Sequence, residues 1–478
     1  MGGRFAVGGV IIVLLAAGTA LTVVLSQIHH VFKVAFPPKS TIKAPPFLDD
    51  IAPGDPATVL ALGSDRRFGD KKKGLEARSD TILVVRLDPR KHAIAVMSIP
   101  RDLKVTIPRH GVRPINAAYA LGGPRLSAET VQGLGLHVSE IVNVNFGGFQ
   151  RAINKLGCVY ADIDRRYFND NHPPVASAEN YATIDLKPGY QLLCGSDSLD
   201  YVRFRHLDDD FVRAARQQDF LRQLKTQVGV GKLFDDREEL LKIFGAYSQT
   251  TIGSRSDAEK LGFVKLVYEA SKNPVTEVRF PGETHPDGSV SVAPGDLRRA
   301  IRNFEAVRGK RGSGGGATRP PKRAPRRKGL APGLVASKRE GEDHVLNLAA
   351  RSRSLPVYFP AARLARGDYA SGSPRSYDLK DRGGKPHRAY RIVLYAGDPG
   401  QYYGVQGTTW DKPPILDNPT DEVRMRRRTY QRYFDGRSIR LIAWRAPGAW
   451  YWVSNTLSKT LSNAQMMDIA RSLQRVGQ

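Results

Sequence analysis

Cysteine is scarce in this chain, whose 478 residues include only Cys158 and Cys194. Two thiols exclude a small disulfide-dense scaffold, and they exclude a structural zinc site built from pairs of cysteines. Hydrophobic residues make up 41% of the chain, which excludes wholesale disorder. Because the length exceeds one ordinary core, two or three domains are expected.

Charge is absent from residues 6–26, AVGGVIIVLLAAGTALTVVLS. A helix of this length spans about 30 Å, which matches the core of a bilayer. A cleavable signal peptide is the competing interpretation, but the apolar run is long and no clear small-residue cleavage site precedes Gln27. A buried soluble helix would have a polar face, which this segment lacks. We predict an uncleaved single-pass anchor in the cell membrane, with a short cytoplasmic tail and the large domain extracytoplasmic.

Acidic residues are absent from residues 308–339, where 11 lysines and arginines lie among glycine, proline and serine. This composition predicts a flexible, solvated linker. The predicted organisation is a tail and anchor at 1–26, a spacer at 27–54, a catalytic domain at 55–305, a basic linker at 306–344 and a small accessory α+β domain at 345–478.

Positive charge is abundant, and the formal net charge is +26. Such a balance indicates an anionic partner, which is nucleic acid, anionic lipid or a polyanionic substrate. Nucleic acid is disfavoured, because no helix-turn-helix, zinc or RNA-binding motif accompanies the charge and a membrane anchor argues against it.

Apolar runs of strand length occupy residues 57–65, 81–88 and 92–100, and the turn at 89–91 joins the last two in a hairpin. Amphipathic helical stretches follow, the longest expected at 211–229. Further strands are expected at 159–164 and 199–205. Mixed strands with interspersed helices predict an α/β fold, in the form of an α/β/α sandwich.

Charged residues lie where the predicted strands end. Asp65 ends the first strand, Asp80 opens the second, and Arg101 and Asp102 follow the third. If these strands are neighbours, the hairpin brings Asp80 and the Arg101–Asp102 pair to one edge of the sheet, where α/β proteins build sites. Carboxylates there could hold a hard cation such as Mg²⁺, beside arginines that hold phosphate. The alternative is turn-capping aspartates next to solvated arginines.

A second arginine group lies in residues 201–220, YVRFRHLDDDFVRAARQQDF. Arg203 and Arg205 would point to the same face of a strand, whereas Arg213, Arg216 and Gln217 would share one face of a helix. Guanidinium groups stay charged and bind phosphate in a bidentate manner, so two converging groups predict a diphosphate between them. The alternative is an exposed basic helix, with its arginines paired to the aspartates at 208–210 and 219.

These segments, taken in order, resemble the LytR-CpsA-Psr family of cell-wall glycopolymer transferases. The resemblance covers about residues 55–230 and weakens towards 300. It is carried by LALGSD, RSDTILVVRLDP, MSIPRDLKV, INAAYALGG, VNFGGFQRAINKLGCV, and LDYVRFRH followed by DFVRAARQQDFL.

The resemblance implies an enzyme that takes a glycopolymer from a polyprenyl-pyrophosphate carrier. It passes the polymer with one phosphate to a hydroxyl of peptidoglycan or a similar acceptor, and polyprenyl phosphate leaves. By motif, Asp65 and Asp80 are the expected ligands of Mg²⁺. The expected catalytic residues are Asp80, Arg101, Asp102, Arg203, Arg205, Arg213 and Gln217. The expected pyrophosphate-binding residues are Arg66, Arg101, Arg203, Arg205, Arg213, Arg216 and Gln217, and Asp210 is a further candidate for a base or partner.

Two features outside these motifs remain open at this point. An extracytoplasmic location favours a disulfide between Cys158 and Cys194, with two buried free thiols as the alternative. Near the C-terminus, strands are expected at 390–397, 438–445 and 450–457, followed by a helix capped by Ser462. The four tryptophans of this region form either a core, which we favour, or a platform for sugars.

Two functions from different classes follow from the sequence. The favoured one is a membrane-anchored glycopolymer phosphotransferase. The other is a non-catalytic protein that binds or assembles cell-wall polymer through the same basic groove. Retention of the whole Asp and Arg set favours the enzyme, since a binding protein has no need of all these groups.

Overall fold

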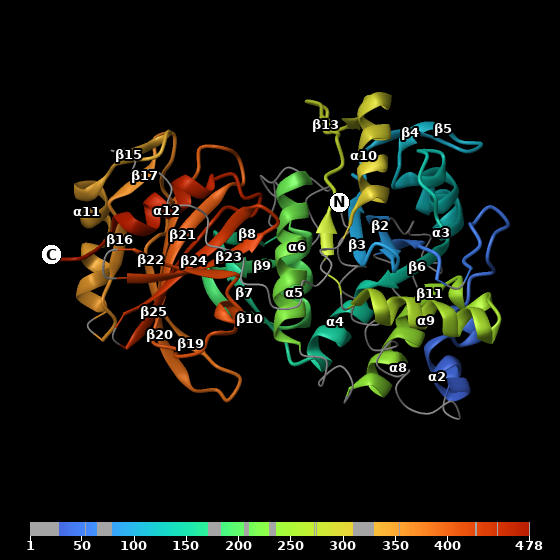
Figure 1. The fold of residues 1–478 in the computed structure, drawn as a ribbon, viewed down its shortest axis with the longest axis horizontal. Helices are drawn as coiled ribbons and strands as arrows, with labels where there is room; N and C mark the ends of the chain where they lie inside the picture. Colours follow the sequence, from blue (N-terminus) through green and yellow to red (C-terminus); the bar gives the residue numbers. More distant parts are fainter. Residues whose placement is uncertain are drawn as a thin grey trace. The chain divides into compact units, whose positions relative to one another are not determined.

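The computed structural model describes residues 28–52, 54–64, 79–170, 183–204, 210–228, 236–271, 273, 275–308, 329–352, 354–425, 428–446 and 448–477. The chain divides into two units (Figure 1). Unit 1 comprises residues 1–158, 194–202 and 228–316, and unit 2 comprises 159–193, 203–227 and 317–478. The domain boundaries expected from composition stay a prediction.

The anchor expected at 6–26 lies outside the described residues, as does the basic linker over 309–328. The prediction of a flexible linker is wrong for its last described part, because β15 (Leu334–Ala336) and the start of α11 (Lys338–Arg351) lie there. In the described part of the chain, no helix has both the length and the apolar character needed to cross a bilayer. The anchor therefore remains a prediction from the sequence.

Unit 1 is built on a six-stranded sheet, counted over the described residues, in the order β11-β6-β1-β2-β3-β12. The strands in chain order are β1 (Ala57–Ser64), β2 (Ser79–Asp88), β3 (Ala93–Ser98), β6 (Glu140–Asn145), β11 (Ser248–Thr250) and β12 (Val275–Glu277). β1 runs parallel to β6 and antiparallel to β2, and β2 runs antiparallel to β3. The three predicted strands and the predicted hairpin are confirmed.

Helices cover both faces of this sheet (Figure 1). On one face, α3 (Ala117–Gln132) and α10 (Pro294–Ala306) share a core with Leu60, Leu62 and Val84. On the other face, α4 (Phe146–Lys155) and α8 (Arg237–Tyr247) contact β6, and α9 (Asp257–Ser271) contacts β2 and β3. Both faces of β1 are buried along its whole length, which explains its continuous apolar sequence.

The remaining elements of unit 1 surround this layer. They are α2 (Ile28–Ala35), η2 (Pro38–Ser40), the hairpin of β4 (Lys104–Ile107) and β5 (Gly111–Pro114), η4 (Ile252–Ser254), and the short pair β13 (Glu283–Thr284) and β14 (Val290–Ser291). Helix α5 (Gly195–Arg203) lies in unit 1 except for its last residue, Arg203, which belongs to unit 2.

Unit 2 contains an eight-stranded antiparallel sheet among its described residues. Its order is β18-β20-β21-β25-β24-β23-β22, and β19 also pairs with β20. The strands in chain order are β18 (Asp368–Tyr369), β19 (Arg375–Lys380), β20 (Pro386–Tyr395), β21 (Tyr402–Thr408), β22 (Asp421–Met425), β23 (Arg428–Asp435), β24 (Ser438–Ala446) and β25 (Ala449–Ser454). The three C-terminal strands expected from the sequence are β20, β24 and β25.

One face of this sheet packs on α11 (Lys338–Arg351) and α12 (Asn463–Ser472). Ser462 caps α12, as the sequence predicted, and the structure adds a capping box with Gln465. Trp444 and Tyr451 lie in this core, with 1% and 0% of their surface exposed. Trp452, fully buried, belongs to the core on the opposite face. The core interpretation is confirmed for Trp444 and Trp452, whereas Trp410 and Trp450 are partly buried at the edge of the second core.

The opposite face is covered by segments that come from much earlier in the chain. β7 (Val159–Ile163) and β10 (Gly189–Leu193) pair with each other, and Tyr160 and Tyr190 insert into the core around Trp452. Helix α6 (Asp210–Gln227) contacts β7 and the short helix η5 (Pro414–Leu416). Unit 2 also holds β8 (Tyr167–Asn169), β9 (Ile184–Leu186), β15 (Leu334–Ala336), β16 (Tyr358–Pro360), β17 (Ala362–Leu364) and β26 (Leu473–Arg475).

The prediction of a strand at 199–205 is wrong for its described residues, because α5 occupies them up to Arg203. The run Tyr-Val-Arg-Phe has the β-branched and aromatic character of a strand. In the structure, however, Leu199 and Val202 are buried at helical spacing, together with Ser198 and Tyr201. Tertiary packing has overridden the local preference.

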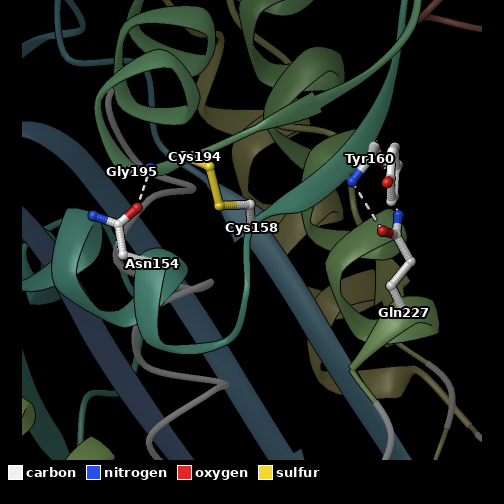
Figure 2. The surroundings of a disulfide bond; sticks show 6 residues. All are labelled: Asn154, Cys158, Tyr160, Cys194, Gly195 and Gln227. Carbon is white, nitrogen blue, oxygen red and sulfur yellow. Dashed lines mark hydrogen bonds between the residues drawn. A yellow bond between two sulfur atoms is a disulfide. The ribbon is translucent and has the colours of Figure 1, made fainter. Parts of the chain in front are cut away.

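Cys158 and Cys194 form a disulfide, which confirms one of the two alternatives left by the sequence (Figure 2). The bond closes the base of the segment 159–193, which leaves unit 1 after one cysteine and returns at the other. Next to it, Asn154 Oδ1 accepts a hydrogen bond of 2.7 Å from the Gly195 amide. Gln227 accepts from the Tyr160 amide at 2.9 Å and donates to its carbonyl at 2.7 Å.

The double variant Cys158→Ala/Cys194→Ala should be about 3–4 kcal/mol less stable to urea than the wild type, because the bridge closes a loop of about 36 residues in the unfolded chain. Reduction of the wild type in urea should give the same loss, which serves as the internal control. A difference under about 1 kcal/mol would show that the bridge does little for stability.

Candidate functional site

Four strand ends of unit 1 meet at one edge of the six-stranded sheet. Ser64, the last residue of β1, pairs with Asn145 at the end of β6 and with Ser79 at the start of β2. β3 ends at the same edge, because Ser98 pairs with Leu83 of β2 and the Ile99 amide donates to the Ile82 carbonyl at 2.9 Å. The predicted convergence of these strand ends is therefore present in the backbone.

Close backbone approach defines this edge. A Cβ atom at Gly63 would lie 2.6 Å from Thr81 Cβ, too near for any side chain, so the strand pair requires glycine there. The pairing register also shifts between Gly63 and Ser64. The glycine of the LALGSD motif thus lets β1 and β2 lie side by side directly before Asp65.

Asp80, Asp65 and Arg66 belong to this edge by sequence. Asp80 is the second residue of β2, and its backbone is described as strand. Asp65 directly follows β1, and both it and Arg66 lie outside the described residues. Their roles as metal and phosphate ligands stay predictions.

Arg101 and Asp102 follow β3 at this edge, as expected. Arg101 Nε lies 3.4 Å from Asp102 Oδ2, and the two side chains are 15% and 25% exposed. Main-chain hydrogen bonds fix this turn, since the Arg101 carbonyl accepts from the Asn116 amide at 3.1 Å and the Asp102 carbonyl accepts from Val290 at 3.0 Å. The backbone that carries Arg101 is thus fixed, and part of its side chain reaches solvent.

Helix α6 of unit 2 carries the second predicted group. The helix expected at 211–229 is confirmed at Asp210–Gln227. Arg213, Arg216 and Gln217 share one helical face and are 3%, 0% and 1% exposed. These values exclude the alternative of an exposed basic face.

Arg216 has aromatic and backbone partners that its sequence did not predict. Its guanidinium lies over the rings of Tyr167, at 4.6 Å, and Phe204, at 5.7 Å, and Nη1 donates to the Phe204 carbonyl at 3.0 Å. Arg165 lies over the same two rings, at 4.5 and 5.4 Å. Because these residues are far apart in the sequence, no local pattern could have revealed the stack.

The other predicted arginines have a different setting from the one expected. Arg203 is the last residue of helix α5, so the argument that it shares a strand face with Arg205 is wrong. Arg205 lies outside the described residues, as do Asp208 and Asp209, and only the backbone of Asp210 is described, at the start of α6. Arg101 and Asp102 belong to unit 1, and α6 belongs to unit 2.

A divalent cation fits the chemistry of the strand-edge aspartates, because carboxylate oxygens are the ligands that Mg²⁺ prefers. Asp65 and Asp80, the expected ligands, would both start from the touching ends of β1 and β2. Over the residues whose side chains are described, no group of three or more acidic, histidine or cysteine side chains is placed to hold a metal ion. A Mg²⁺ site at this edge would need the two aspartates named by the motif.

The C-terminal half of α6 is tied to the sheet by charge. Arg222 Nη1 donates to Asp435 Oδ2 at 3.0 Å, and Lys459 Nζ donates to the same oxygen at 2.6 Å. Burial alone would raise the pKa of Asp435, but the charges of Arg222 and Lys459 hold that pKa below its ordinary value. The carboxylate thus stays ionised between two cations.

Acid should remove the contribution of Asp435 to stability. A carboxyl whose pKa is lowered by folding stabilises the fold fully above its ordinary pKa of about 3.9, and this stabilisation is lost as the pH falls through the lower folded value. Urea unfolding at several pH values should therefore show wild type more stable than Asp435→Asn at pH 7, with the gap closing below about pH 4. A gap that stays constant down to pH 2 would contradict this.

Comparison with known proteins settles the family. The family model described as the LytR_cpsA_psr family matches residues 32–300, more than half of the chain. The chain belongs to the LytR_cpsA_psr family. The match includes β1, the β2–β3 hairpin, Arg101, Asp102 and the whole of α6.

Several curated relatives align with this family region. The polyisoprenyl-teichoic acid–peptidoglycan teichoic acid transferase TagU of Oceanobacillus iheyensis is 28% identical over 298 residues, 59% of this chain and 86% of that protein. The regulatory protein MsrR of Staphylococcus aureus is 30% identical over 262 residues, 52% of this chain and 73% of that protein. An uncharacterised S. aureus protein is 33% identical over 195 residues, but the chain spans only 47% of its length.

Solved structures also align with this chain. A structure of TagT bound to LI-WTA overlaps with a TM-score of 0.40 and 24% identity, covering 54% of this chain and 92% of that one. The crystal structure of Bacillus subtilis TagV gives a TM-score of 0.40 and 24% identity, covering 53% and 96%.

Proposed function

We propose that this protein transfers a glycopolymer from a polyprenyl-pyrophosphate carrier to a hydroxyl of the cell wall, on peptidoglycan or a similar acceptor, and releases polyprenyl phosphate. Membership of the LytR_cpsA_psr family carries the proposal. It is supported by the relative TagU, whose name describes a transferase of teichoic acid to peptidoglycan from a polyisoprenyl carrier. The arginines of the two site groups suit a diphosphate substrate, and the aspartates suit a divalent cation that would accompany it.

The reaction requires neutralisation of charge on a phosphate and correct placement of the acceptor oxygen. In our proposal Arg101 contacts the pyrophosphate, with Arg203, Arg205, Arg213 and Gln217 completing the clamp. Asp80 or Asp102 removes the proton of the acceptor hydroxyl, which attacks the phosphorus nearer the sugar while the bond to the bridging oxygen breaks. Asp65 and Asp80 would hold Mg²⁺, which when bound supplies charge neutralisation at the phosphates.

Location is part of the same proposal. The uncharged run at 6–26 would anchor the chain in the cell membrane, with the units outside, where the lipid carrier presents its polymer. The basic residues at 308–339 would add non-specific attraction to anionic lipid or polymer.

A transfer assay tests the proposal directly. The full-length protein is incubated with a synthetic lipid-pyrophosphate-linked glycan, peptidoglycan fragments and Mg²⁺, and mass spectrometry follows the products. The expected result is an acceptor that has gained glycan and one phosphate, together with free lipid phosphate. Binding of the donor without any transfer would instead support the non-catalytic alternative, a cell-wall polymer-binding protein.

A further inference from the structure

The C-terminal part of the chain, beyond the family match, shares a core with the family region. Tyr160 and Tyr190 are both fully buried among residues of the C-terminal sheet. The Tyr160 ring lies 5.0 Å from that of Trp410, and the Tyr190 ring lies 5.7 Å from that of Trp452. Two aromatic residues of the family region are thus core residues of the C-terminal sheet.

Directed polar contacts fix the same packing. The Tyr160 hydroxyl donates to the Lys380 carbonyl at 2.7 Å, and the Tyr190 hydroxyl accepts from the Ile415 amide at 3.1 Å. The Tyr377 hydroxyl accepts from the Tyr190 amide at 2.8 Å. Because a hydrogen bond requires a defined distance and angle, these bonds fix the orientation of the tyrosine side chains against the C-terminal sheet.

Helix α6 enters this packing through its last three turns. Asp219, Arg222 and Gln223 line a small polar cavity of about 30 Å³, whose other wall includes Arg440 and Lys459 of the C-terminal part. The cavity has room for one or two waters. Arg222 bridges Asp219 within α6 and Asp435 at the end of β23. Asp435 thus lies between Arg222 of α6 and Lys459 of the C-terminal part, and these two contacts fix the rotation of the helix about its axis.

Arg222 and Arg213 lie on opposite faces of helix α6. At about 100° per residue, Arg222 lies about 180° around the helix from Arg213 and about 14 Å along it. One face of α6 is therefore fixed to the C-terminal sheet, while another carries the buried side chains of Arg213 and Gln217. A turn of the helix about its axis would move these side chains away from any bound phosphate.

We propose that packing on the C-terminal sheet fixes the position of helix α6. In this proposal Arg222 and Asp435 are positioning residues for the phosphate-binding side chains of that helix, Arg213 and Gln217. The proposal rests on the proposed function for the role of Arg213 and Gln217. It assigns to the C-terminal part of the chain a role inside the transferase site, in place of a separate accessory activity.

The test uses full-length protein with Asp435→Asn, which keeps the shape of the side chain and removes its charge. The matched control is Asp421→Asn on the edge strand β22 of the same sheet, which removes the carboxylate that lies 2.7 Å from Arg432 Nη2 on β23. The first measurement is hydrogen exchange of the α6 amides at 213–217. The second is affinity for geranylgeranyl pyrophosphate, by calorimetry.

We expect Asp435→Asn to speed hydrogen exchange of the amides at 213–217 while unfolding stays cooperative. Its affinity for the probe should fall about tenfold or more, because a small misplacement of a binding group is costly. The Asp421→Asn control should change neither. Arg222→Lys, which keeps the charge, should retain most of the affinity, and Arg222→Met should lose it as Asp435→Asn does. If Asp435→Asn does not fold, the two Arg222 variants decide.

Unchanged exchange and unchanged affinity in Asp435→Asn would overturn the proposal. An Arg213→Ala variant separates this failure from failure of the proposed function. If Arg213→Ala weakens binding of the probe and Asp435→Asn does not, Arg213 binds phosphate but the C-terminal sheet does not position it. If Arg213→Ala binds the probe like the wild type, the clamp itself is wrong and the positioning role falls with it.

Discussion

Replacing Arg391 with methionine should lower the free energy of unfolding of this protein by about 3–5 kcal/mol. Arg391 on β20 is fully buried and pairs with Asp162 on β7, which is 8% exposed, at 3.1 Å. It also donates to Ser454 Oγ at 2.9 Å. Removing the guanidinium leaves a carboxylate buried without its cation, and this unpaired charge is the main cause of the loss.

Urea unfolding followed by tryptophan fluorescence suits this measurement, because Trp444 and Trp452 report from the two cores of the C-terminal sheet. The control is Arg388→Met on the same strand, whose partner Asp378 lies 3.0 Å away with both side chains largely exposed. That change should cost at most about 1 kcal/mol. The double variant Arg391→Met/Asp162→Asn should recover part of the loss, and equal losses for Arg391→Met and Arg388→Met would contradict the argument.

Replacing Arg101 with alanine should lower the rate of glycopolymer transfer by about 10²–10³-fold, if the proposed function holds. The side chain reaches solvent beside Asp102, and its positive charge would oppose charge that develops on the transferred phosphate. Because the turn is held by main-chain hydrogen bonds that the substitution leaves in place, the melting temperature should change little.

The matched control for Arg101→Ala is Arg109→Ala, on the turn of the next hairpin. Arg109 is 74% exposed and pairs with Glu129 at 3.1 Å. Its loss should leave the transfer rate within about twofold, since an exposed pair contributes little. A transfer rate of Arg101→Ala close to that of Arg109→Ala would remove Arg101 from the mechanism.

Local sequence was sufficient for the elements that form the strand edge. The apolar runs that became β1, β2 and β3 have strand length and turn residues between them, so their pairing followed from periodicity and chain connectivity. The position of Arg101 and Asp102 after β3 followed from the same pattern. The helical face of Arg213, Arg216 and Gln217 was equally predictable, because spacing alone sets it.

The sequence by itself thus determined the mixed α/β character, the family, the edge at which β1, β2 and β3 meet, and the C-terminal strands and capped helix. Only the tertiary structure decided three other matters. It made 199–203 helical, and it stacked the Arg216 guanidinium on the rings of Tyr167 and Phe204. It also packed Tyr160, Tyr190 and α6 on the C-terminal sheet. Each depends on contacts between residues far apart in the chain, and periodicity reports only the faces of a single element, not the partner each face will bury.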